Sequence, residues 1–425
     1  MTDISKKKLI KAELPGGFRD YGPKEAIWKN DAMTKIRTTF ERFGFDPIET
    51  PAVERTEVLT GGEEDSGKII FNIKGSRDES QDATMSLRFD LTIPLARFLA
   101  ENTDIPKPFK RYQIGEVFRG ESPQAGRYRE FTQVDADIVG SSAREAEAEL
   151  FLLLQNIFSK LGVSNYKIKI NSRKLLNNLP KIAGFTEEKL WPVLRIIDKK
   201  DKIGTDGIIK ELENELSGET AKKVKDFLAS DVQKMPGGEE LQELPALFET
   251  LGVKNWEINL SLVRGLSYYT GIIFEVILTE APEIGSIASG GRYDNLLANF
   301  TGQPIPAVGI SIGIDRLYAG LEKLGRSEKR TTNTQVLVFL LEQSLTREYF
   351  GIAESLRNAG INTALYLGED RAFQAQLAYA IKKDIPYVVI MGESEKAKGA
   401  VAIKNLATRE QKEVSIGEIA EYFKE

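Results

Sequence analysis

The chain has 425 residues, a length that predicts two or three domains rather than one. Hydrophobic residues make up 41% of the sequence and charged residues 28%, as is typical of a folded globular protein. No apolar run is long enough to predict a membrane span. The charged start of the chain has no apolar stretch behind it, so we expect a cytoplasmic protein without a secretory signal.

Two residue types that often carry chemistry are missing. Without cysteine, the chain has no disulfides, no thiolate metal sites and no cysteine nucleophile. Without histidine, any proton transfer must use carboxylates, lysine, tyrosine or the substrate itself. The net charge of −5 also predicts that any nucleic acid is bound by local basic patches.

The first part of the chain predicts strands mixed with helices. Apolar residues at helical spacing and short runs of alternating residues, bounded by turn residues, indicate these elements. The expected elements are a helix at 23–44, an extended proline-containing segment at 45–54, a strand running into a helix at 84–99, strands at 109–119 and 129–140 joined by the loop GESPQAGRY, a helix at 143–162 and a strand at 165–171.

The character of the sequence changes three times after residue 172. Residues 173–250 are rich in Lys, Glu and Leu at helical spacing and predict a helical insertion. Strand patterns return at 257–279, 286–291 and 306–313, and the polar stretch 325–334 predicts a linker. Residues 335–425 alternate strands and helices in the order βαβαββα, which predicts a separate small α/β domain.

The expected strand at 129–140 carries an unusual set of polar side chains. Strand alternation places Arg129, Phe131, Gln133, Asp135 and Asp137 on one face, while the other face is suited to a core. Such a face is about as often a solvated surface as a binding site. The preceding strand ends in Phe-Arg-Gly-Glu, so the hairpin brings Arg and Glu beside these carboxylates. This mixture favours a ligand with both phosphate and ammonium groups.

Three later arginines are candidates for ligand binding. Arg264 lies in an expected strand at 262–275, where a buried guanidinium would need an anionic partner. Arg292 follows two glycines that indicate either a tight turn or a close backbone approach, and the turn is the simpler interpretation. Arg316 stands near the start of an expected helix, where the helix dipole does not favour a cation. The sequence has neither a GxGxxG fingerprint nor a P-loop, so an ATP site must be of another kind.

These motifs resemble those of a known family. LPGGFRDYGPKEAIW with FGFDPIETPAVE resembles the opening segment and motif 1 of class II aminoacyl-tRNA synthetases. FKRYQIGEVFRGESPQAGRYREFTQVDADIVG resembles motif 2, and AVGISIGIDRL resembles motif 3. LRFDLTIPLAR and VRGLSYYTGIIFE are similar to segments particular to the histidyl-tRNA synthetase family, and the tail resembles the class IIa anticodon-binding domain.

The resemblance implies an α/β fold, with an antiparallel sheet flanked by helices in the catalytic domain. It divides the chain into a catalytic domain at 1–324, interrupted by the helical insertion at 173–250, then the linker at 325–334 and an anticodon-binding domain at 335–425. It also implies the activation of L-histidine with ATP and Mg²⁺, and transfer of the histidine to tRNA(His) for protein biosynthesis. The family pattern further implies a homodimer, with no membrane partner.

Roles of individual residues follow from the same resemblance. Arg264 and Arg119 are implied as catalytic cations, and Gln124 as a contact to the tRNA acceptor end. ATP binding is implied for Arg119, Glu121, Arg127, Phe131 and Arg316, with Glu121 also holding Mg²⁺. Histidine binding is implied for Asp90, Thr92, Gln133, Asp137, Tyr268 and Tyr269.

One position departs from the family pattern. Ser267 stands where the family usually has an aspartate, so a carboxylate beside the pocket is lost. Two alternative functions stay open: a non-catalytic relative such as the regulatory subunit of ATP phosphoribosyltransferase, or a class IIa synthetase for another amino acid. The first lacks an anticodon-binding tail and often loses motif arginines, whereas this chain has both the tail and the arginines.

Overall fold

The computed structural model describes residues 10–61, 69–75, 84–123, 126–232, 235, 237–263, 268–327 and 330–423. The chain divides into two compact units. The first unit comprises Met1–Arg19 and Ala32–Ser327, and the second comprises Asp20–Asp31 and Glu328–Glu425. None of the described helices is long and apolar enough to span a bilayer.

An eight-stranded sheet in the order β1-β5-β6-β11-β10-β9-β7-β8 organises the first unit. The neighbouring strands from β5 to β7 are antiparallel, and the edge pairs β1–β5 and β7–β8 are parallel. The strand bounds are β1 Asp46–Pro47, β5 Phe109–Phe118, β6 Glu130–Val139, β7 Tyr166–Ser172, β8 Trp256–Ile258, β9 Ile272–Leu278, β10 Ser286–Arg292 and β11 Ala307–Gly313.

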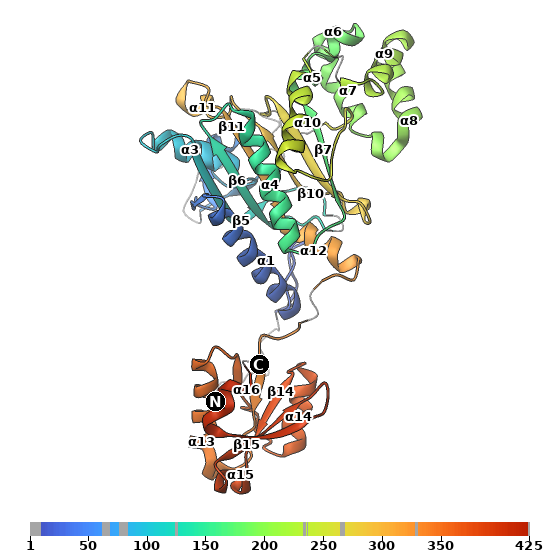
Figure 1. The fold of residues 1–425 in the computed structure, drawn as a ribbon. Helices are drawn as coiled ribbons and strands as arrows, with labels where there is room; N and C mark the ends of the chain where they lie inside the picture. Colours follow the sequence, from blue (N-terminus) through green and yellow to red (C-terminus); the bar gives the residue numbers. More distant parts are fainter. Residues whose placement is uncertain are drawn as a thin grey trace. The chain divides into compact units, whose positions relative to one another are not determined.

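Helices cover this sheet and bury apolar side chains against it. In α4 (Arg144–Lys160), Phe151 packs with its ring centroid 4.8 Å from that of Phe274 in β9 and 4.9 Å from that of Phe248. Figure 1 shows α4 lying across the sheet. The other helices of this unit are α2 Thr56–Thr60, α3 Thr92–Glu101, η5 Pro282–Ile284, α11 Ala298–Thr301 and α12 Ile314–Lys323. Helix α1, Pro23–Arg42, begins in the segment assigned to the second unit and ends in the first. A small sheet is formed by β2 Val53–Arg55, β4 Met85–Leu87 and β3 Phe71–Ile73.

Helices follow β7, as the sequence predicts for residues 173–250. They form a cluster at one end of the first unit (Figure 1). Their bounds are α5 Arg173–Asn177, α6 Leu179–Ala183, η3 Glu187–Lys189, α7 Leu190–Ile197, α8 Lys200–Glu215, α9 Gly218–Leu228 and α10 Glu239–Leu251.

The second unit has its own sheet, in the order β13-β12-β14-β15-β16. Alternate residues of β12 enter two separate cores, with Val336 and Val338 in one and Leu337 in the other. The expected alternation of strands and helices is present, but the order differs from βαβαββα, because the short helix α15 and a further strand extend it to βαβαβαββα. The bounds are β12 Val336–Val338, η6 Gln343–Leu345, α13 Thr346–Asn358, β13 Thr363–Leu365, α14 Phe373–Lys382, β14 Tyr387–Ile390, α15 Glu393–Ala397, β15 Ala400–Asn405, β16 Gln411–Ser415, η7 Ile416–Glu418 and α16 Ile419–Tyr422.

Two local expectations need correction. The strand expected at 262–275 starts only at Ile272, and Tyr268 and Tyr269 lie before it in a segment without regular structure. Gly290 and Gly291 belong to strand β10 rather than to a turn. A Cβ atom on Gly290 would lie 2.0 Å from the carbonyl oxygen of Gly309, so close backbone approach explains the glycines.

Candidate functional site

Two adjoining hollows open on the polar face of the large sheet. They share four side chains, those of Arg119, Gln133, Ser289 and Ser311. The first hollow is lined further by Glu121, Gly126, Arg127, Tyr128, Phe131, Ser286, Ile287, Ala288, Gly313, Asp315 and Arg316. The second hollow is lined further by Asp90, Thr92, Asp137, Tyr268, Tyr269, Gly290, Tyr293, Gly309 and Ile310.

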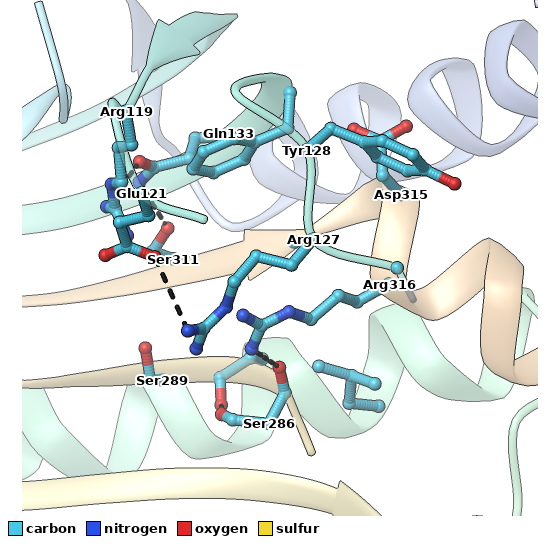
Figure 2. A pocket seen from close by; sticks show the side chains of 15 residues that line it. Arg119, Glu121, Arg127, Tyr128, Gln133, Ser286, Ser289, Ser311, Asp315 and Arg316 are labelled. Carbon is cyan, nitrogen blue, oxygen red and sulfur yellow. Dashed lines mark hydrogen bonds and ion pairs between the residues drawn. The ribbon is translucent and has the colours of Figure 1, made fainter. Parts of the chain in front are cut away.

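Two guanidinium groups reach into the first hollow from different elements (Figure 2). Arg127 lies in the connection between β5 and β6, and its Nη1 lies 3.4 Å from a carboxylate oxygen of Glu121. Arg316 stands in the first turn of α12 and donates to the carbonyl oxygen of Ser286 over 3.0 Å. The Arg127 side chain is 45% exposed, so its cation is available to an anionic ligand.

The wall between the hollows is formed by Arg119 and Gln133. Arg119 comes directly after β5 and donates to the carbonyl oxygen of Phe89 over 2.9 Å and to Oε1 of Gln133 over 3.2 Å. Its guanidinium also lies over the ring of Phe131, 5.1 Å from the centroid. These contacts hold the guanidinium cation of Arg119 at the boundary between the two hollows.

The second hollow is built on a buried ion pair. Nη2 of Arg111 in β5 lies 2.6 Å from Oδ2 of Asp137 in β6, and both side chains are at most 3% exposed. Tyr293 donates its hydroxyl proton to the other oxygen of Asp137. Burial raises the pKa of Asp137, and Arg111 and Tyr293 oppose that rise. A Cβ atom on Gly309 would lie 1.9 Å from Asp137 Oδ1, so this carboxylate requires glycine on the facing strand.

Asp90 places a second carboxylate in this hollow. It stands just before α3, where its Oδ1 accepts the backbone N–H of Ile93 over 3.1 Å. Its Oδ2 is buried and has no hydrogen-bond partner within the described part of the chain. Burial raises the pKa of Asp90 to about 6, although the Ile93 N–H and the Arg119 charge act in the opposite direction. A carboxylate oxygen of this kind is suited to a ligand cation.

A third carboxylate, Asp135, lies beneath the shared wall. It is only 1% exposed, and burial raises its pKa to about 7 against the opposing charge of Arg111. The interpretation of this strand face as a solvated surface is therefore wrong for Gln133, Asp135 and Asp137, which are all at most 5% exposed. Gln133 and Asp137 of the same face line the hollows.

The structure brings together all the expected site residues that it describes. The expected ATP ligands line the first hollow: Arg119, Glu121, Arg127, Phe131 and Arg316. The expected histidine ligands line the second: Asp90, Thr92, Gln133, Asp137, Tyr268 and Tyr269. Gln124, Arg264 and the departing position Ser267 lie outside the described residues.

Sequence reasoning missed several residues of the site, notably Arg111, Tyr293 and Ser311. A charged residue inside the alternating strand FKRYQIG was a signal for Arg111, because a buried arginine needs an anion. Arg292, in contrast, is not part of either hollow. It forms a buried ion pair with Glu147 of α4 at 2.7 Å and thereby has a structural role.

Comparisons with known proteins agree with this geometry. A family model described as histidyl-tRNA synthetase matches residues 17–317, and one described as an anticodon binding domain matches residues 335–425. The histidine–tRNA ligase of Wolinella succinogenes is 40% identical, over 96% of this chain and 97% of the relative. That of Aeropyrum pernix is also 40% identical, over 95% and 96%.

A solved structure shares the fold over nearly the whole chain. The crystal structure of histidyl-tRNA synthetase from a Nostoc species superposes with a TM-score of 0.86 at 33% identity, and covers 98% of this chain and 99% of that one. The likeness therefore extends over the length of both units. The chain belongs to the histidyl-tRNA synthetase family.

Proposed function

We propose that this chain is a histidine–tRNA ligase that acts in two steps at the paired hollows. In the first step, a carboxylate oxygen of histidine attacks the α-phosphorus of ATP, and pyrophosphate leaves to give histidyl-adenylate. In the second, the terminal ribose hydroxyl of tRNA(His) attacks the adenylate carbonyl; AMP leaves, and the hydroxyl proton passes to a phosphate oxygen of the departing AMP. The observation that carries this proposal is the cation of Arg119 on the wall between a cation-lined hollow and a carboxylate-lined hollow.

ATP occupies the first hollow in this proposal. Phe131 and Arg316 hold the adenine between a ring and a guanidinium, as stacking and cation–π attraction favour. Arg119 contacts the α-phosphate, and Arg127 reaches the outer phosphates from the loop. When ATP is bound, its phosphate oxygens take the place of the protein groups that Arg119 and Arg127 contact in the ligand-free site. Together with Arg264, Arg119 stabilises the charge that develops as the phosphoryl group transfers.

Histidine occupies the second hollow. Its ammonium group lies against Asp90, Thr92 and Gln133, and the unpartnered Oδ2 of Asp90 supports this position. Its imidazole ring lies between Asp137 and Tyr269, with Tyr268 alongside. Asp137 is held rigidly by Arg111 and Tyr293, so it can select a ring nitrogen that bears a proton. The carboxylate of histidine then points toward Arg119 and the α-phosphate.

Mg²⁺ accompanies ATP in this proposal, with Glu121 as its protein ligand. The residues fit such an ion, because Mg²⁺ usually binds through one or two carboxylates together with substrate phosphates. The Glu121 side chain is 35% exposed and forms an ion pair with Arg127 at 3.4 Å. No group of three acidic residues with metal-binding geometry occurs within the described ranges. The ion would neutralise phosphate charge as pyrophosphate departs.

The tRNA contacts both parts of the chain. We assign the anticodon to the domain at 335–425 and the acceptor end to Gln124. The catalytic domain then spans 1–324 with its helical insertion at 173–250, followed by the linker at 325–334. The motif 1 resemblance at 45–54 supports a homodimer, and the substrates place the protein in the cytoplasm.

Amino-acid-dependent exchange of pyrophosphate into ATP tests the function. Each of the twenty amino acids is supplied in turn, and histidine should support exchange far better than any other. Faster exchange with another amino acid would identify a synthetase of different specificity. No exchange with any amino acid, in a protein that still binds histidine, would identify the non-catalytic alternative. The Ser267→Asp variant belongs in the same assay, since activity equal to or above that of the wild type would show that serine is merely tolerated.

A shortened chain ending at Thr332 tests the role of the tail. Because the expected ATP and histidine residues all precede residue 317, this chain should keep histidine-dependent exchange. It should charge tRNA poorly, mainly through reduced affinity. Full charging by the shortened chain would refute the anticodon role, and loss of exchange in a folded protein would refute the domain division.

A further inference from the structure

The amide of Gln133 is held by two neighbours that the proposed mechanism does not use. Its Nε2 donates to Oδ1 of Asp135 over 3.2 Å and to Oγ of Ser311 over 2.7 Å. Its Oε1 accepts from Nη2 of Arg119 over 3.2 Å. In Figure 2, Arg119, Gln133 and Ser311 gather at one side of the first hollow.

The chemistry of these neighbours determines which way the amide points. An ionised carboxylate only accepts hydrogen bonds and a guanidinium only donates them, so the nitrogen must face Asp135 and the oxygen must face Arg119. Ser311 supports the same orientation, because its hydroxyl proton goes to Asp135 and leaves a lone pair for Gln133. A reversed amide would place donor against donor at Arg119 and acceptor against acceptor at Asp135.

The adjacent strands offer no other side chain at this level to hold the amide. The residues paired with Gln133 are Gly115 on β5 and Gly313 on β11. Asp135 is paired with Ser311 on β11, two residues further along β6 on the same face. Among the described residues, Asp135 and Ser311 therefore hold the nitrogen end of the Gln133 amide, and Arg119 holds the oxygen end.

We infer that Asp135 is a positioning residue for recognition of the substrate ammonium group. It fixes the Gln133 amide so that Oε1, an acceptor, faces the ammonium subsite beside Asp90, and Ser311 assists it. This inference rests on the proposed function, since it assigns the ammonium group of histidine to the second hollow. It adds that a buried carboxylate outside both hollows controls the affinity for that group.

The environment of Asp135 is consistent with this role. The side chain is 1% exposed, Gln133 and Ser311 donate hydrogen bonds to it, and the charges of Arg111 and Arg88 act on it. A buried carboxylate without such partners would be strongly disfavoured. Its pKa of about 7 means that tests should be made at about pH 8.5, where the carboxylate is ionised.

The Asp135→Asn variant separates ammonium recognition from the rest of binding. Asparagine has the same size as aspartate but only one acceptor oxygen, so one of the two donors, Gln133 or Ser311, must face the new NH₂ group and turn away. The Gln133 amide can do so by rotating, and it then presents its NH₂ group to the ligand ammonium. The dissociation constant of histidinol, which has the ammonium group, should rise about tenfold or more. That of the deamino analogue imidazolepropionate should change less than about twofold.

A double-mutant cycle tests whether Asp135 acts through Gln133. In a Gln133→Ala background, Asp135→Asn should weaken histidinol binding no further, because the amide that it orients is gone. Ser311→Ala provides a second variant in case Asp135→Asn does not fold, and should show the same selectivity with a smaller effect. Additive effects in the cycle would overturn the inference.

Titration calorimetry with the full chain distinguishes the possible failures. If the wild type does not bind histidinol, the proposed function itself fails. If the wild type binds histidinol but Asp135→Asn weakens histidinol and imidazolepropionate equally, the function stands and the positioning role is wrong. Selective loss of histidinol binding, abolished in the Gln133→Ala background, would support the inference.

Discussion

The two hollows share a wall but hold their charges in different ways. In the second hollow, Arg111 and Asp137 are at most 3% exposed and pair with each other at 2.6 Å. In the first, the side chains of Arg127 and Glu121 are 45% and 35% exposed and lie 3.4 Å apart. Buried charges are costly unless their partners are fixed, whereas exposed pairs contribute little to stability. The structure thus joins a rigid compartment, suited to selecting one small ligand, to an open one suited to a flexible polyphosphate.

Removal of Asp137 should have the largest effect. The Asp137→Ala variant leaves Arg111 buried without its anion, and the loss of one partner from a buried pair costs about 3–5 kcal/mol of unfolding free energy. Histidine-dependent exchange should also be lost. The matched variant Glu121→Ala removes one partner of the exposed pair and should cost at most about 1 kcal/mol. Urea unfolding followed by tryptophan fluorescence measures both, and equal losses would mean that the compartments do not differ.

Two glycines of strand β11 allow each hollow to be perturbed alone. A Cβ atom on Gly309 would lie 1.9 Å from Asp137 Oδ1, whereas the nearest atom to one on Gly313 is 3.7 Å away. Gly309→Ala should therefore displace Asp137 and raise the KM for histidine about tenfold to hundredfold. Gly313→Ala should fold normally and affect chiefly the KM for ATP. Steady-state kinetics with histidine and ATP varied in turn measures both KM values. An equal change of both KM values in either variant would show that the two hollows cannot be perturbed separately.

Asp90 should show the cost of keeping an unpaired carboxylate in the rigid compartment. Its folded pKa of about 6 lies above the ordinary value of 3.8, so its protonated form stabilises the fold at low pH. That contribution is lost as the pH rises from about 4 to about 6. The unfolding free energy of the wild type minus that of Asp90→Asn should fall across this range, by on the order of 1–3 kcal/mol, and then stay level. A difference that does not vary with pH would contradict burial of an ionisable Asp90.

Arg127 should show the smallest effect. It belongs to the open compartment, and its pair with Glu121 is exposed. Arg127→Ala should raise the KM for ATP about fivefold, corresponding to about 1 kcal/mol, without a change in melting temperature or in the KM for histidine. A clear loss of thermal stability would show that the first hollow is as tightly built as the second.

Local patterns predicted the strands of the site more accurately than they predicted the environment of its side chains. The expected strands at 109–119 and 129–140 agree with β5 and β6 within about one residue at each end, because alternation and turn residues are local signals. The burial of Asp135 and Asp137 depends on β11, a strand that arrives from more than 150 residues later in the chain. No local pattern contains that information.

The partners of the charged side chains could likewise be identified only from the tertiary structure. Arg111 meets Asp137 through the register of β5 on β6, and Tyr293 reaches the same carboxylate from beyond β10. The two glycines before Arg292 fitted a turn as well as a strand, and the position of Gly309 on the facing strand decides between them. The resemblance to a family predicted which residues bind ATP and which bind histidine. Periodicity and spacing could not separate these two sets of residues.

A crystal structure of the chain with bound histidinol and ATP tests the central claim most directly. The account predicts ATP in the first hollow, with its adenine between Phe131 and Arg316. It predicts histidinol in the second, with the ammonium group against Asp90 and Gln133 and the imidazole ring against Asp137. An imidazole ring beside Arg119, or histidinol bound outside the second hollow, would contradict the division of the site into a rigid amino-acid compartment and an open nucleotide compartment.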